Sequence, residues 1–202
     1  MESATDLLVS GNTATNVSTG EGGGIFLSGT STLSATNLTV SNNTSGNNGG
    51  GLRATGTGTN MTLTNLLVSR NTASNSDGGG IHIDVATLTV NNGTIAANQC
   101  YDDGGGLRIE TSGTTANLRN CIFWNNAVGL PTASGSPTGK QISMTTGTSV
   151  TINNCNLPTL TVSTTGNNQE IYTTGATTTL TVEPATSPPT RSSATVSPGI
   201  IA

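Results

Sequence analysis

The amino-acid sequence predicts an all-β fold, a right-handed parallel β-helix of roughly seven coils with about three short strands in each coil. Three observations lead to this prediction: a repeat of about 27 residues, an alternation of apolar and polar residues inside each repeat, and glycine or asparagine where the alternation is interrupted. A composition with only 8% charged and 2% aromatic residues also fits a disordered chain. Disorder predicts no fixed period, however, and this chain has one.

Two phrases that keep step with each other define the repeat. A triple glycine followed by Ile or Leu recurs four times, and its apolar residue advances by 27, 29 and 26 residues. A second phrase, an apolar residue followed by x-x-Asn, recurs five times, with another amide or acid six residues before each asparagine. The apolar residues of the first phrase are Ile25, Leu52, Ile81 and Leu107. Two columns with one period predict coils that stack at about 4.8 Å, the spacing of paired strands.

Between the phrases the residues alternate with period two, as they do in β-strands. Three strands per coil leave no room for crossover helices, and glycine supplies the positive φ that sharp corners need. Asparagine tolerates left-handed backbone, and its amide both donates and accepts hydrogen bonds. We therefore expect two internal asparagine ladders, one of Asn37, Asn65, Asn92 and Asn120, and one of Asn43, Asn71, Asn98 and Asn126.

The repeat defines the expected domain organisation. Residues 1–183 are predicted to form the β-helix, with an insertion at Leu130–Gly139, and residues 184–202, rich in Pro, Ser and Thr, a C-terminal tail or linker. A net charge of −4 with six basic residues gives no footprint for nucleic acid. No apolar stretch approaches the roughly 18 residues of a membrane span. Residues 1–20 lack a signal-peptide pattern, so we expect an exported chain whose signal is not part of this sequence.

The two phrases, Gly-Gly-x-Ile and Phe-x-x-Asn, resemble the repeats of polymorphic outer membrane autotransporter passengers. Phe123-Trp124-Asn125-Asn126 matches the second phrase fully. The chain also looks like bacterial surface proteins of the pectin-lyase-like superfamily, in which a β-helix precedes a cell-surface anchor. This resemblance covers roughly residues 6–183 and implies a bacterial protein located outside the cell or at its surface. It does not choose a function, because the fold hosts lyases, hydrolases, adhesins and inert stalks.

The outward positions of the first strand gather several ionisable residues of this charge-poor chain, and we expect them to form an exposed face. Its candidate binding residues are Phe26, Arg53, His82, Asp84, Arg108, Glu110 and Tyr172. A solvated charge array, a contact for carbohydrate or another partner, and a carboxylate pair for glycosidic cleavage are three interpretations of this face. No nucleophile, base and orienting group form a recognisable motif around the single histidine, so we expect no catalytic residues.

Acids also precede the glycine corners, at Glu21, Asp77, Asp102 and Asp103. Stacked carboxylates are weak candidates for calcium, but their spacing fits no defined calcium loop, and acids at turns commonly form Asx turns. We therefore predict no metal and no cofactor. Cys121 and Cys155 occupy an inward column, where they are either small buried hydrophobes or a coil-to-coil disulfide.

The outward face of the second strand is rich in threonine, for example at Thr62-x-Thr64 and Thr87-x-Thr89. This pattern resembles the Thr-x-Thr arrays of β-helical ice-binding proteins, although threonine is also a good strand former on an exposed face. Glycosylation or a partner surface are further interpretations of the same residues.

These patterns lead to an expected function. We expect a non-catalytic extracellular structural or adhesive segment, such as a surface stalk, adhesin or filament subunit. The alternatives are a polysaccharide-binding or polysaccharide-cleaving β-helix and an ice-binding protein. The expected partners are further copies of the chain, stacked head to tail, and a carbohydrate or host-surface ligand. The alternative to stacking is that the chain is part of a longer β-helix, whose neighbouring coils cover its ends.

Overall fold

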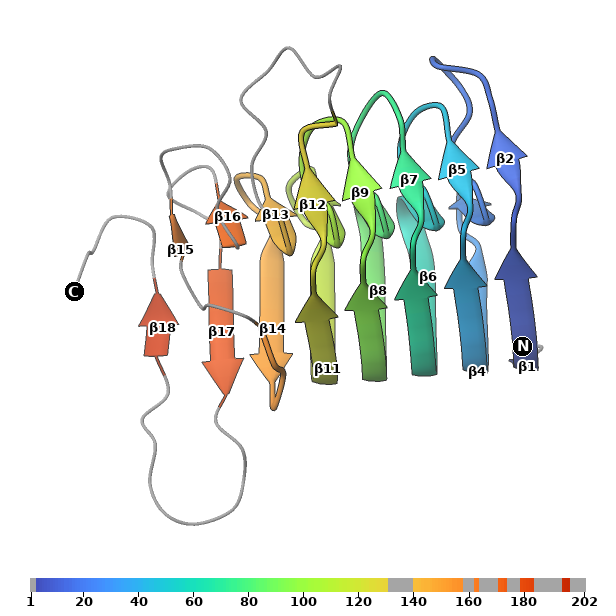
Figure 1. The fold of residues 1–202 in the computed structure, drawn as a ribbon. Helices are drawn as coiled ribbons and strands as arrows, with labels where there is room; N and C mark the ends of the chain where they lie inside the picture. The colour runs from blue at the N-terminus through green and yellow to red at the C-terminus, as the bar shows by residue number, and fades with distance from the viewer. Residues whose placement is uncertain are drawn as a thin grey trace.

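The computed structural model describes residues 3–130, 140–157, 162–163, 171–173, 179–183 and 194–196. Within these ranges the chain forms a parallel β-solenoid, whose coils lie side by side from β1 to β17 (Figure 1). The predicted all-β fold and parallel β-helix architecture are therefore confirmed. The described part of the chain contains no helix long and apolar enough to cross a membrane.

The strands form one 13-stranded sheet and one five-stranded sheet. The larger sheet contains β1 Ser3–Ser10, β3 Ile25–Ser28, β4 Thr32–Ser41, β6 Leu52–Ser69, β8 Ile81–Ala96, β10 Leu107–Glu110, β11 Thr115–Trp124, β13 Ile142–Met144, β14 Ser149–Asn153, β15 Val162–Ser163, β16 Ile171–Thr173, β17 Thr179–Glu183 and β18 Ala194–Val196. The smaller sheet contains β2 Thr13–Ala14, β5 Thr44–Ser45, β7 Thr72–Ala73, β9 Gln99–Cys100 and β12 Ala127–Val128. All pairings are parallel except β17 with β18.

The solenoid has about four turns, where roughly seven coils were expected. The complete turns lie between Ile25 and Val128, and partial coils flank them. The second-strand column nevertheless holds seven strands, in the order β1, β4, β6, β8, β11, β14 and β17. Each complete turn also contains a fourth short strand, which belongs to the smaller sheet and was not anticipated. A two-residue strand carries too little alternation to stand out in a sequence.

Several of the expected strands are continuous. β6 and β8 each run through the first, second and third strand positions, although Asn65 and Asn92 turn the backbone with φ of 54° and 59°. A single left-handed residue bends the chain, and pairing with the neighbouring coil resumes at the next residue. Asparagine at the corner therefore changes the strand direction without ending the strand.

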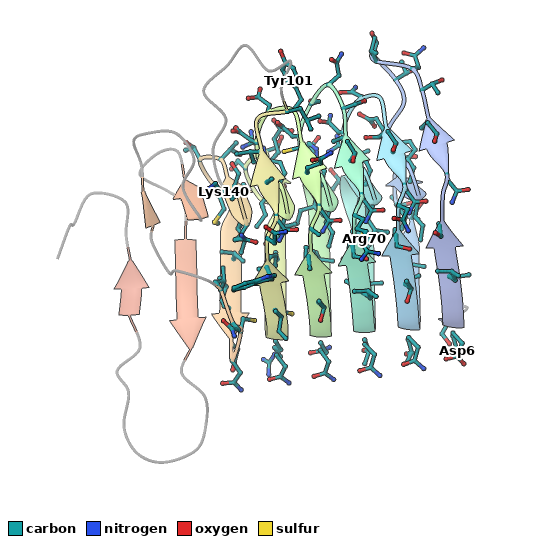
Figure 2. The ribbon with its side chains drawn as sticks, in the orientation of Figure 1. Asp6, Arg70, Tyr101 and Lys140 are labelled. Carbon is teal, nitrogen blue, oxygen red and sulfur yellow. The ribbon has the colours of Figure 1, made fainter. Side chains whose placement is uncertain are left out.

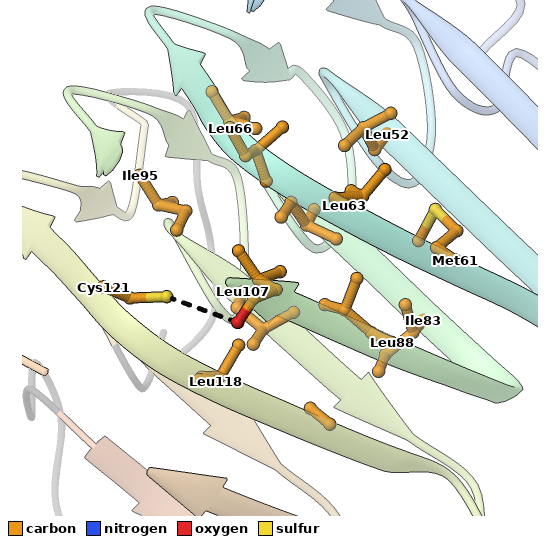
Figure 3. Packing of buried hydrophobic residues seen from close by; sticks show 14 of the residues in the cluster. Leu52, Met61, Leu63, Leu66, Ile83, Leu88, Ile95, Leu107, Leu118 and Cys121 are labelled. Atoms are coloured by element: carbon orange, nitrogen blue, oxygen red, sulfur yellow. Dashed lines mark hydrogen bonds between the residues drawn. The ribbon is translucent and has the colours of Figure 1, made fainter. Parts of the chain in front are cut away.

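The core is built by apolar residues that stack on their own counterparts. Leu63 of β6 pairs with Val90 of β8, which pairs with Leu118 of β11, and all three are buried. The first and third strands contribute parallel stacks, for example Leu52 on Ile81 and Val68 on Ile95. Figure 3 shows these side chains converging from neighbouring coils into one cluster. Replacing a buried leucine of such a stack by alanine typically costs about 2–5 kcal/mol.

The second predicted asparagine ladder is confirmed. Asn43, Asn71 and Asn98 each donate from Nδ2 to Oδ1 of the next asparagine in the row, over 3.0, 2.9 and 3.0 Å. Each also donates to a backbone carbonyl of the third strand, as Asn71 does to Val40 over 2.9 Å. The row begins at Asn12 and continues beyond Asn126 to Gln141. From Asn43 to Asn126 these side chains are buried, so the ladder satisfies amides that would otherwise be unpaired in the core.

The first predicted ladder exists, but the expectation that it is internal was wrong. Asn65 donates to Asn37 over 2.9 Å and Asn120 to Asn92 over 3.0 Å, yet these side chains are exposed at the corner. Asp6 accepts from Asn37 at the N-terminal end of the row (Figure 2). A residue with φ near 55° at this corner directs its side chain outward, so the amides bond to each other on the surface.

The two ladders differ in burial, and this difference predicts different costs for the same substitution. Asn71→Leu removes the Oδ1 that accepts from the Asn43 amide groups and the Nδ2 that donates to the Val40 carbonyl. The groups left without a partner are buried. We expect a loss of about 3 kcal/mol or more in the free energy of unfolding. The matched variant Asn65→Leu leaves no buried group unpaired and should lose only about 1–2 kcal/mol, from left-handed backbone strain. Urea unfolding of both variants measures the difference, and equal losses would contradict it.

Candidate functional site

The register of the first strand brings most of the predicted binding residues together. Arg53 pairs with His82 and His82 with Arg108, while Asp84 pairs with Glu110 two residues further along. With the acids of the preceding corners they form the charge cluster, which consists of Glu21, Arg53, Asp77, His82, Asp84, Asp103, Arg108 and Glu110. Phe26, at the same position in β3, is exposed. The backbone of Tyr172 pairs with Ser143, and its side chain lies outside the described residues.

The expectation of an exposed face was wrong for the three central side chains. Arg53 is 5% exposed, His82 0% and Arg108 7%. The glycine corner of each coil folds back across the outward face of the strand that follows it. A Cβ atom built on Gly49 would lie 2.8 Å from the Cβ of Arg53, and one on Gly78 would lie 2.5 Å from that of His82. Glycine is therefore required at these corners, and its backbone covers the outward column.

The two arginines neutralise the corner acids. Arg108 Nη1 lies 3.1 Å from Asp103 Oδ2 and 2.6 Å from Ser143 Oγ, and its Nε lies 3.3 Å from Asp77 Oδ2. Arg53 pairs more loosely, with its Nε 3.6 Å from Glu21 Oε2 and its Nη2 3.5 Å from Asp84 Oδ2. Buried charges must be paired, because the desolvation of an isolated ion costs far more than the fold can supply.

His82 lies between the two guanidinium groups and is held neutral. Burial lowers the pKa of His82 to about 4, and the hydrogen bond to Glu110 only partly offsets that shift. His82 Nε2 lies 3.0 Å from Glu110 Oε2, whereas the buried Nδ1 has no hydrogen-bond partner among the described residues. The same contact with His82 is the largest cause that lowers the pKa of Glu110 to about 2. At neutral pH the pair is thus a neutral imidazole donating to a carboxylate.

The candidate calcium residues face arginine or one another. Burial raises the pKa of Asp77 to about 6, although the Arg108 guanidinium beside it favours the charged form. Burial also raises the pKa of Asp102, and the neighbouring Asp103 adds to that shift. Among the described residues no three or more His, Cys, Asp or Glu side chains are grouped as metal ligands. Glu21, Asp77 and Asp103 instead serve as counter-ions inside the fold.

The chemistry of the charge cluster does not suit glycosidic cleavage. That reaction needs a carboxylic acid that stays protonated near neutral pH and reaches the substrate oxygen. Glu110 is ionised because of its bond to His82, and Asp84 is paired with Arg53. Asp77 has a raised pKa, but its side chain is only 14% exposed and contacts Arg108. The geometry fits an internal ion-pair network better than a site for a substrate.

Two further surfaces lie outside the charge cluster. The predicted threonine face is in register, since Ser34, Thr62 and Thr89 occupy one outward row, which then continues through Asn117. The third strand presents an apolar stripe that the sequence analysis did not identify. Its exposed members are Leu8, Leu67 and Ile122, which share one outward row with Thr39 and Thr94 between them, and Trp124, two residues beyond Ile122. Successive side chains of a strand point to opposite faces, so the inward placement of Leu7 and Val9 already implied that Leu8 points outward.

Two opposing titrations in the charge cluster predict an unusual pH dependence. The unfolded chain protonates His82 below pH 6.5 and the folded chain only below about 4, so acidification through this range weakens the fold. Asp77 has the opposite sign, because it takes up its proton near pH 6 when folded and near 3.8 when unfolded. The two contributions should largely cancel between pH 6 and 4.5 in the unaltered chain, and below pH 4.5 the lowered pKa of Glu110 adds a further loss of stability.

Single substitutions should separate the two titrations. Between pH 6.5 and 4 we expect the stability of Asp77→Asn to fall more steeply than that of the unaltered chain. His82→Asn should instead gain stability over the same range. Urea unfolding at several pH values gives the slopes, which are independent of any uniform loss caused by the substitutions. Three equal slopes would show that these groups do not titrate as the geometry implies.

Comparisons with protein-family models, with curated proteins and with solved structures found no match to this chain. The resemblance to autotransporter passengers and pectin-lyase-like proteins is therefore not accompanied by a family assignment.

Proposed function

We propose that this chain is a non-catalytic structural or adhesive segment that works at the bacterial cell surface or outside the cell, and that it associates by strand addition at β1. The observation that carries the proposal is the uncovered first coil. A surface with very few charges and many hydroxyl and amide groups is consistent with a stalk or adhesin. The internal use of the buried charges supports a structural role over a catalytic one.

β1 offers an edge to another strand. Among the described residues it pairs with β4 alone, from Ser3 to Ser10 with only Asp6 left out of the register. Its inward Leu7 is 37% exposed, whereas Leu38 and Leu66, at the same position in the next two coils, are 0% and 3% exposed. A long edge with unpaired backbone groups and an uncovered apolar layer is a template for another strand. Strand addition there would bury Leu7 and complete the backbone hydrogen bonds.

The opposite end of the second-strand column is occupied. β18 pairs antiparallel with β17, with Leu180 opposite Val196 and Val182 opposite Ala194. Head-to-tail stacking through the β17 edge would require β18 to leave. Among the residues that the structure describes, no strand covers the edge of β1, and for that reason we place the association there. A contact between different surfaces gives open filaments when the rotation does not close, and a contact of one surface with itself gives a closed dimer.

An ice-binding role is less well supported. The threonine face is regular in the first two complete turns, but it meets Asn117 and the exposed Arg119 in the fourth. The Arg119 side chain interrupts the flat surface. Carbohydrate contact is compatible with the same hydroxyl and amide groups and stays within the proposed adhesive role.

A charge at the β1 edge should prevent association. Leu7→Lys places an ammonium group over the end of the core, where another strand would have to bury it. We expect sedimentation velocity to show concentration-dependent association of the unaltered chain and a monomer for this variant. The matched control is Leu67→Lys, which changes an exposed leucine of the apolar stripe and leaves the edge intact. A monomeric unaltered chain, or equal loss in both variants, would overturn the proposal.

We also expect no turnover of polysaccharides. Reducing-end assays and assays for unsaturated products on pectins and alginates should give the same signal for the unaltered chain, Glu110→Gln and Asp77→Asn. Cleavage that either substitution abolishes would show that the charge cluster is an active site. The circular dichroism spectrum of each variant serves as the control for folding.

A further inference from the structure

The inward column of the third strand changes its residue type toward the C-terminal coils. In the first coils this position holds leucine, in β8 it holds Gly93, and then it holds Cys121 and Cys155. Arg119 pairs with Asn153, and Ile122 bridges to Asn156. The same offset of 34 residues places Cys121 directly beside Cys155 in the adjacent coil.

The two cysteines are in contact. The backbone N–H of Cys121 donates to Cys155 Sγ over 3.2 Å, and the thiols donate to backbone carbonyls, Cys121 to Arg119 over 3.2 Å and Cys155 to Asn153 over 3.4 Å. Both are free thiols. In the coil before Cys121 this position is Gly93. Its lack of a side chain leaves room for the Cys121 sulfur, because a Cβ atom at residue 93 would lie only 3.2 Å from Cys121 Sγ. Cys121 lies in the apolar cluster of Figure 3, and Cys155 is half-buried at its margin.

We propose that Cys121 and Cys155 form a coil-to-coil disulfide when the chain meets an oxidising environment, so that this pair is a redox modification site. Neighbouring strands of a parallel sheet are separated by about 4.8 Å, within the Cα separation of roughly 4.4–6.8 Å that disulfides adopt. Both side chains project from equivalent positions toward the same interior. The bond joins the fourth complete turn to the partial coil that follows it.

The two thiols have different roles in the reaction. Cys155 is half-buried, and the hydrogen bond from Cys121 lowers its pKa, so its thiolate attacks one sulfur of a small disulfide such as oxidised glutathione. One glutathione thiolate leaves, and a mixed disulfide forms at Cys155. Cys121 then loses its proton to solvent, and its sulfur attacks Cys155 Sγ and releases the second glutathione. Two protein thiols are oxidised to one disulfide while one glutathione disulfide is reduced to two thiols.

Cys100 is the internal control. It lies buried in β9 of the smaller sheet, in register with Ala73 and Val128. Neither neighbour carries a thiol, so Cys100 has no disulfide partner among the described residues. Cys100→Ser should therefore leave the oxidation unchanged.

The test uses the full chain, reduced and then incubated with oxidised glutathione. We expect the number of alkylatable thiols under denaturing conditions to fall from three to one. Peptide mass spectrometry should show Cys121 linked to Cys155, and Tm should rise by about 5 °C or more. Cys121→Ala should stop at a glutathione adduct on Cys155. Three remaining thiols, a lasting adduct in the unaltered chain, or a link through Cys100 would overturn the proposal.

Discussion

The in-register stacking of coils is the constraint on which the rest of this structure depends. Because each coil repeats the previous one at the spacing of paired strands, the nearest neighbours of a side chain are its own counterparts above and below. The residues at equivalent positions of successive coils must therefore pack against one another or bond to one another. Leucine, isoleucine and valine satisfy this by packing, and asparagine satisfies it because one amide is both donor and acceptor. A column of identical charges would repel itself.

The charge cluster shows how the chain meets this constraint with ionisable residues. Arg53 and Arg108 occupy one column but are separated by His82, which burial keeps neutral. The corner acids lie beside the arginines, so opposite charges face each other across columns. A buried pair of this kind contributes less to stability than its geometry suggests, since desolvation offsets most of the attraction. Its clearest effect is to fix which coil lies beside which.

The features that repeat could be predicted from the sequence, whereas those that depend on how a corner or a neighbouring segment covers a face could not. The column of Leu63, Val90 and Leu118 and the ladder through Asn71 follow from period and alternation. The burial of Arg53 and His82 does not, because it arises when Gly49 and Gly78 carry the backbone across an outward face. The exposure of Asn65 depends on the direction of a left-handed corner, and the antiparallel pairing of β18 with β17 departs from the repeat. A repeat can be recognised in a sequence, whereas the burial of side chains by a folded corner is seen only in the structure.

The buried ladder also gives the coil stack a polarity. From Asn12 to Asn126 each Nδ2 donates to the Oδ1 of the following coil, and the row then reaches Gln141. The amide dipoles therefore all point the same way along the solenoid axis. A coil added in the same sense extends this aligned row, whereas a coil added in the reverse sense brings carbonyl oxygen toward carbonyl oxygen. The interior of the protein thus distinguishes its two ends electrically, even where their outer surfaces carry almost no charge.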